Sequence, residues 1–132
     1  MQLSVTVRNA RLESIESTIG TSPKLRLYTG AAPANCAAAR SGTLLAELTL
    51  PGNWLADASG GTKVLAGTWS GTASNAGTAG HWAIMDAAGT TCHMQGTLSA
   101  TGGGGEMQLD NPVIASGQSI SVSTFTITGG NA

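Results

Sequence analysis

The chain has 132 residues, enough for one domain with a single hydrophobic core. Charged residues make up 10% of it, against roughly 25% in typical soluble domains. No Lys or Arg follows Lys63, and the net charge of −1 leaves no basic stripe of the kind that nucleic-acid binding needs.

The start of the chain lacks the basic and apolar regions of a secretory signal. No run approaches the roughly 18 apolar residues that span a bilayer. A surface with so little charge is poorly protected against association. We therefore expect a protein that contacts other proteins, and neither nucleic acid nor a membrane.

Residues 1–20 are predicted to be an N-terminal amphipathic helix or arm. Their apolar residues are spaced by 7, 3 and 4 positions and so share one helix face: Val5, Leu12, Ile15 and Ile19. Gly20 then stands where a left-handed residue ends a helix. Because a short isolated helix is marginal in water, this segment must pack on its own domain or on a second copy of the chain. The sequence leaves both alternatives open.

Residues 21–132 show the alternation of apolar and polar residues that is typical of β-strands. About seven strands are expected, joined by short turns and two long loops at 30–42 and 70–80. The run 62–69 is one of these strands. Since no helix separates the strands, the prediction is an all-β fold: an antiparallel β-sandwich or jelly roll preceded by one helix, with a closed barrel as the second choice.

The segment 81–98 has the pattern of a hairpin. Its turn, residues 86–90, has the form of a three-residue loop with Gly89 left-handed. Pairing Asp86 with Thr90 puts five side chains on one face: Trp82, Ile84, Cys92, Met94 and Leu98. This register makes Cys92 a core thiol. We expect Cys36 and Cys92 to be reduced, with a single disulfide between them as the alternative.

The last strand, 119–128, carries its apolar residues on two parities. Ile120 and Val122 share one face, whereas Phe125 and Ile127 fall on the other. We expect a bulge near Ser123 or Thr124, which would bring all of them to the core side.

The two histidines are the candidates for a metal site. The hairpin register places His81 and His93 diagonally on one face, with Asp86 and Glu47 as the nearest acids. A zinc site needs three or four ligands, so two surface histidines are the simpler interpretation. Cys92 and His93 are adjacent in a strand and point to opposite faces, so they cannot act together. We expect no catalytic, cofactor-binding or metal site, and no enzymatic activity.

Three tryptophans stand out among few aromatic residues. Trp69 and Trp82 fall on predicted core faces. Trp54 follows a Pro-Gly stop in irregular chain and is the best candidate for an exposed anchor.

Several short runs are characteristic of a known family and together cover nearly the whole chain. They are Val7-Arg8-Asn9-Ala10-Arg11-Leu12, Ile15-Glu16, Ile19-Gly20, Gly30-Ala31-Ala32-Pro33-Ala34-Asn35-Cys36, Ala79-Gly80-His81, Gly89-Thr90-Thr91-Cys92-His93, Thr101-Gly102-Gly103-Gly104-Gly105 and Thr124-Phe125-Thr126-Ile127-Thr128. With them the chain resembles a family of small, mostly uncharacterised virion structural proteins of tailed bacteriophages and prophages. The resemblance implies a virion structural role and carries no active-site residues.

Three hypotheses for the function follow from these features. The first is a capsid decoration or cement protein, a homo-oligomer assembled in the host cytoplasm that binds other virion proteins, the major capsid protein foremost. Its contacts would be Val5, Leu12, Ile15, Ile19, Trp54 and the 30–42 loop. The alternative is a tail- or fibre-associated module that recognises a host surface glycan through an exposed Trp54. An enzyme with a metal at His81 and His93 is the third hypothesis.

Overall fold

The structure is a computed structural model that describes residues 1–130, so the last two residues of the predicted 21–132 domain lie outside the described part. One helix, α1 (Val5–Ile19), precedes the strands. The strands are β1 (Lys24–Thr29), β2 (Leu44–Thr49), β3 (Thr62–Val64), β4 (Ser70–Thr72), β5 (Gly77–Met85), β6 (Cys92–Ala100), β7 (Met107–Leu109), β8 (Val113–Ile114) and β9 (Ser119–Thr128).

The predicted helix is present, with the ends that its sequence indicates. Ser4 caps the N-terminus, and its hydroxyl oxygen accepts a hydrogen bond from the Val7 N–H at 3.2 Å. Gly20 ends the helix with a φ of 93°, and its N–H donates to the Glu16 carbonyl. Its ψ of −170° lies outside the left-handed helical region, but a φ this positive is one that glycine adopts readily, and the helix stops there.

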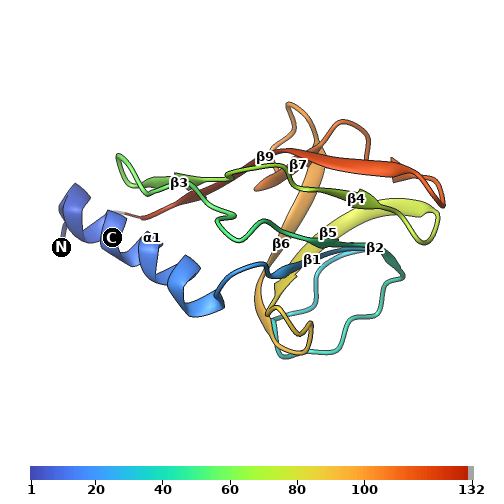
Figure 1. The fold of residues 1–132 in the computed structure, drawn as a ribbon, viewed down its shortest axis with the longest axis horizontal. Coiled ribbons are helices and arrows are strands. Elements are labelled where there is room, and N and C mark those ends of the chain that lie inside the picture. Colours follow the sequence, from blue (N-terminus) through green and yellow to red (C-terminus); the bar gives the residue numbers. More distant parts are fainter. Residues whose placement is uncertain (131–132) are drawn as a thin grey trace.

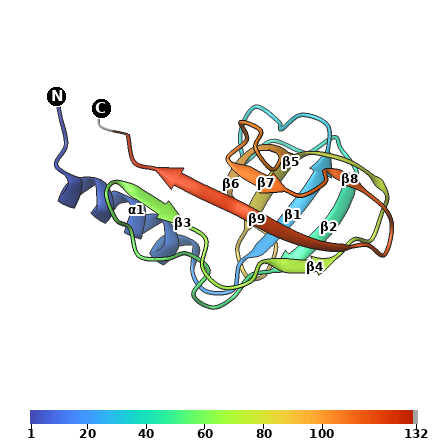
Figure 2. The same ribbon diagram turned by 90° about the horizontal axis from the view of Figure 1, so that it is seen from above.

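The strands form one curled sheet in the order β2-β1-β5-β6-β7-β9-β3. Strand β9 crosses the whole molecule and is shared: β7 pairs with one of its edges, and β3 and β4 pair with the other (Figure 2). A single bridge between Ala46 and Ala73 brings the end of β4 against β2. The sheet thus curls into a half-barrel around its apolar face (Figure 1).

The molecule is mostly β with one helix, as predicted, but the sheet is mixed. Strands β6 and β7 are parallel, with Leu98 opposite Met107. Parallel neighbours ordinarily need a crossover of about a dozen residues. Here the glycine-rich residues 101–106 make the return, with Gly102 at a φ of 88°. The purely antiparallel arrangement is therefore wrong, and a sandwich or jelly roll is not confirmed.

The predicted strand 62–69 is divided into two. Strand β3 ends at Val64 and β4 begins only at Ser70. Gly67, at a φ of 69°, lies between them and turns the chain. The segment expected to be a loop at 70–80 consequently contains β4 and the start of β5.

The β5–β6 hairpin has the predicted turn but a different register. Gly89 is left-handed, and the Asp86 N–H donates to the Thr91 carbonyl, one residue beyond the predicted pair. A bulge then makes Met85 face Cys92 and Ile84 face Met94. The shift at the turn and the shift at the bulge add up to two residues. Ile84 and Met94 therefore still share a face of the sheet, as predicted, and both pack on the main core. Cys92 changes face and joins a small outer cluster with Tyr28, Ala83 and Met85.

The bulge expected in the last strand is confirmed. Gln108 pairs with Thr124 and Leu109 with Val122, so Ser123 is the extra residue. The shift brings Val122 and Phe125 to the same buried side.

An aromatic chain runs through the core. The ring centroids of Trp82 and Phe125 lie 5.1 Å apart, those of Phe125 and Trp69 5.2 Å, and those of Trp69 and Trp54 6.0 Å. All four side chains are buried. Such pairs add roughly 0.5–1.5 kcal/mol each beyond the burial of their area. The chain connects the interior of the curled sheet to the part of the molecule that carries α1.

Two regions can be distinguished (Figures 1 and 2). The sheet lobe is the curled sheet with its core. The helix lobe consists of α1, the docking segment (residues 55–61) and β3, and it projects from one end of the sheet.

Candidate functional site on the N-terminal helix

A polar face of α1 binds the docking segment of the same chain. The Asn9 amide oxygen accepts from the Gly61 N–H at 2.9 Å, and a Glu16 carboxylate oxygen accepts from the Leu55 N–H at 3.0 Å. Between them a Glu13 oxygen accepts from the Ala58 N–H. The three acceptors recur at helical spacing, so one face of α1 serves the backbone donors that an adjacent strand would otherwise satisfy.

Lys63, on β3, binds the same polar face of α1 through ion pairs. Its side chain is 0% exposed, and its ammonium lies 2.7 Å from a Glu13 oxygen and 3.4 Å from a Glu16 oxygen. It also donates to the Ala56 carbonyl at 2.9 Å. An ammonium removed from water needs such partners, because burying an unpaired charge costs several kcal/mol. The Ala58 N–H, together with the Lys63 ammonium, lowers the pKa of Glu13 below its ordinary value.

The apolar stripe of α1 is used largely by its own domain. Leu12 is 2% exposed and Ile19 is 8% exposed, and Ile15 packs partly buried against the main core. These residues were predicted as contacts to a partner. In this chain Ile15 and Ile19 pack on the main core, and Leu12 is buried beside Gly129. Val5 differs, because 48% of it is exposed.

The free end of α1 carries exposed apolar side chains. Val7, on the first turn with Val5, is 46% exposed, and Met1 just before it is 97% exposed. Exposed valines elsewhere are Val64 on β3 and Val113 on β8. The exposed side chains of Met1, Val5 and Val7 thus stand at the N-terminal end of α1, which is the end farther from the sheet lobe (Figure 2). These three residues are called the tip of the helix lobe.

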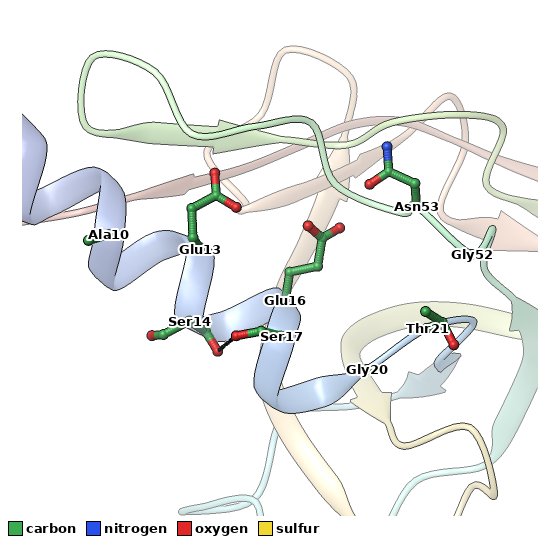
Figure 3. Close-up of a pocket in the computed structure, with 9 residues that line it drawn as sticks. All are labelled: Ala10, Glu13, Ser14, Glu16, Ser17, Gly20, Thr21, Gly52 and Asn53. Carbon is green, nitrogen blue, oxygen red and sulfur yellow. Dashed lines mark hydrogen bonds between the residues drawn. The ribbon is translucent and has the colours of Figure 1, made fainter.

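An open groove of about 800 Å³ lies beside the second half of α1. Its small helix residues are Ala10, Ser14 and Ser17, and the turn residues Gly52 and Asn53 form the opposite wall (Figure 3). Figure 3 shows Glu13 and Glu16 pointing toward the chain that passes over the helix, whereas Ser14 and Ser17 lie on another side of it. Both serine hydroxyls donate to carbonyls of the preceding turn, so they line the groove without reaching across it.

The expected exposure of Trp54 is wrong. Trp54 is 0% exposed, and its indole N–H donates to the Gly20 carbonyl at 3.0 Å. The helix that precedes it in the sequence and the aromatic chain behind it enclose the ring. The residues next to Trp54 in the sequence, irregular chain after a Pro-Gly stop, do not indicate that distant segments bury it.

The histidine pair is also separated. His81 is 0% exposed on the outer side of the sheet, stacked on Tyr28 with ring centroids 5.1 Å apart. His93, displaced by the hairpin bulge, lies in a hollow with Ile15, Ile19 and Met94 on the side of α1. The predicted placement on one face is therefore wrong. Within residues 1–130 no three side chains of His, Cys, Asp or Glu gather as metal ligands.

The 30–42 loop, another predicted contact, lies over the outer face of the sheet. The Gln95 amide donates to the Pro33 carbonyl at 2.7 Å, and the Arg40 guanidinium lies over the Tyr28 ring. Much of the loop remains exposed at its alanines.

Sequence reasoning missed the polar face of α1 and Lys63. Asn9, Glu13 and Glu16 lie between the apolar residues of the predicted helix, and no role was predicted for them from the sequence. Their spacing of 4 and 3 residues, the same as that of an apolar stripe, was the available signal. Lys63 offered none, because its partners come from a helix that is distant in the sequence.

Comparison of the chain with protein-family models, with curated proteins and with solved structures yields no match. Among the described residues, no helix combines the length and apolar character needed to cross a membrane.

Proposed function

We propose that the chain is a virion structural protein of a tailed bacteriophage, and that it acts as a capsid decoration or cement protein. Its partners would be other virion proteins, the major capsid protein foremost, and further copies of itself. Assembly would take place in the host cytoplasm. The resemblance of the sequence runs suggested this role.

The observation that carries the proposal is the exposed apolar tip of the helix lobe. Val5 and Val7 are exposed on the first turn of α1 and Met1 is exposed just before it, and the helix is itself held by Lys63 and the docking segment. A rigid arm with an apolar end can insert into a junction between subunits with little loss of conformational entropy. Modest affinity for each copy suffices where many copies bind a repeating shell.

The glycan-binding alternative has lost its motivating feature. It required an exposed aromatic platform centred on Trp54. All three tryptophans are at most 2% exposed, and Tyr28 and Phe125 are buried as well. No specific observation in the structure now favours this alternative over the first.

The test uses the full chain with Val5 and Val7 both replaced by Ser, and Val113→Ser as the matched control. Val113 is 60% exposed on β8, so its replacement removes the exposed surface of one valine elsewhere in the molecule. Solution mass is measured by light scattering, and binding by cosedimentation with phage capsids that lack this protein. We expect the double variant to lose about tenfold or more in association, and the control to match wild type.

Equal association of the double variant and the control would overturn the proposed contact. Binding by neither wild type nor variants, with monomeric mass throughout, would overturn the decoration role. Deleting residues 1–19 is a poorer test, because it also removes the partners of Lys63 and the cover of Trp54.

A further inference from the structure

The 30–42 loop is anchored to the outer face of the sheet on both sides of Cys36. Before Cys36, the His81 ring nitrogen Nδ1 lies 2.9 Å from the Gly30 carbonyl oxygen. The Gln95 amide also holds the Pro33 carbonyl, at 2.7 Å. These contacts come from β5 and β6, so the first half of the loop follows the sheet closely.

Arg40 anchors the second half of the loop. One of its guanidinium nitrogens, Nη2, lies 3.1 Å from the Gln95 amide oxygen and 3.0 Å from the Cys92 sulfur. The guanidinium carbon is 5.3 Å from the centre of the Tyr28 ring. Cys36 is therefore held between two anchors that both end on Gln95, three residues along β6 from Cys92.

The two thiols meet beneath this loop. Both cysteines are free, the Cys92 sulfur lies 3.0 Å from Arg40 Nη2, and the Cys36 thiol lies close enough to the Cys92 thiol to interact with it. Each is partly buried, with Cys92 packed beside Tyr28 and Met85. Cys92 reaches this position only because the hairpin bulge turns it out of the main core.

We propose that Cys36 and Cys92 are a redox-active pair that closes into an intramolecular disulfide and locks the 30–42 loop onto β6. The inference rests on the placement of the two thiols and of the anchors around them, and it does not depend on the proposed virion role. The reduced pair is the form that the structure holds.

The oxidant we name is a small-molecule disulfide such as oxidised glutathione. One protein thiolate attacks a sulfur of the oxidant, which forms a mixed disulfide and releases one glutathione thiolate. The second protein thiolate attacks the protein sulfur of that mixed disulfide, which forms the Cys36–Cys92 bond and releases the second glutathione. Two protein thiols are oxidised, one disulfide is reduced to two thiols, and the two protons pass to the released glutathione.

The environment of Cys36 makes it the poorer nucleophile toward an external disulfide. Burial, with the neighbouring Cys92, raises the pKa of the Cys36 thiol to about 11. Because the thiolate is the nucleophile, a cysteine that is protonated at neutral pH reacts slowly with an external disulfide. Held against Cys92, it needs only to attack a mixed disulfide already formed beside it.

The experiment treats the full chain with oxidised glutathione, blocks free thiols with N-ethylmaleimide, and measures intact mass and melting temperature. We expect wild type to add neither maleimide nor glutathione, to remain monomeric on a non-reducing gel, and to show a Cys36–Cys92 cross-linked peptide after digestion. Its melting temperature should rise by roughly 5–15 °C and return on reduction.

Cys36→Ser and Cys92→Ser serve as paired controls. Each keeps one thiol and should end with a single glutathione or a single maleimide and no rise in melting temperature. Wild type that takes up two maleimides after oxidation, keeps stable glutathione adducts, or links between chains would overturn the proposal. Because these readouts come from wild type alone, they decide the proposal even where a variant folds poorly.

Discussion

The sheet lobe and the helix lobe are held together by different forces. In the sheet lobe, backbone pairing and a buried aromatic and aliphatic core supply the stability. In the helix lobe, carboxylate and amide oxygens of α1 bind backbone N–H groups of the docking segment, and Lys63 neutralises the two carboxylates. The helix is thus neither a free arm nor an ordinary core helix. It is a rigid extension whose apolar stripe and polar stripe both face its own chain.

The two regions meet at Trp54, whose ring joins the aromatic chain and whose N–H caps the end of α1 through the Gly20 carbonyl. Replacement of Trp54 by Ala should therefore damage both lobes at once. We expect a loss of about 3–5 kcal/mol in the free energy of unfolding, measured by urea denaturation. Val113→Ala, at an exposed position, should change it by less than about 0.5 kcal/mol. A small change in the free energy of unfolding for Trp54→Ala would contradict the burial of Trp54 and support the exposed position that the sequence suggested.

The polar attachment of the helix lobe is probed by Lys63→Met, which keeps the length of the side chain and removes its charge. We expect a loss of about 1.5–3 kcal/mol, because charge-assisted hydrogen bonds disappear while two partly hydrated carboxylates remain. Lys24→Met is the matched control, since Lys24 donates only to the exposed Thr49 hydroxyl. Equal effects of the two substitutions in thermal unfolding would show that Lys63 does not fasten the helix.

Acid should loosen the helix lobe through Glu13. The folded-state pKa of Glu13 is lowered by the Ala58 N–H first and by Lys63 second. A depressed carboxyl pKa contributes stability that is present above the unfolded value, and that is lost as the pH falls through the folded value. The protection factor of the Ala58 amide against hydrogen exchange should fall below about pH 4.5 in wild type.

Glu13→Gln is the sharpest control for this smallest effect. It keeps the side-chain oxygen and removes the titration, so the acid dependence of the Ala58 protection factor should flatten. Asp86 in the sheet lobe serves as an internal reference for acid sensitivity outside the helix lobe. Its pKa is also lowered, first by the Thr90 N–H in the hairpin turn. If the Ala58 protection factor in Glu13→Gln keeps the acid dependence of wild type, a group other than Glu13 causes that dependence.

Local rules succeeded where neighbours in the sequence decide the outcome. The helix ends at Gly20 and the hairpin turns at Gly89 because glycine adopts a positive φ at both positions without a steric clash. The bulge at Ser123 could be predicted because the apolar residues on either side of it have opposite parity.

Local rules failed where a distant segment provides the environment. Cys92 and His93 exchanged roles because a bulge opposite Met85 changed their parity, and the turn residues do not encode that bulge. The parallel pairing of β6 and β7 was missed because a glycine-rich stretch reads only as a flexible loop.

The amino-acid sequence by itself determined that the chain is β-rich with one N-terminal helix, where that helix ends, and how weakly charged its surface is. These properties follow from periodicity, from steric limits on φ and from composition. Only the tertiary structure decided that Trp54 is buried, that Glu13 and Glu16 face Lys63, and that Cys36 lies against Cys92. Each of these depends on which surfaces of remote segments pack together, and burial and pairing are properties of that packing.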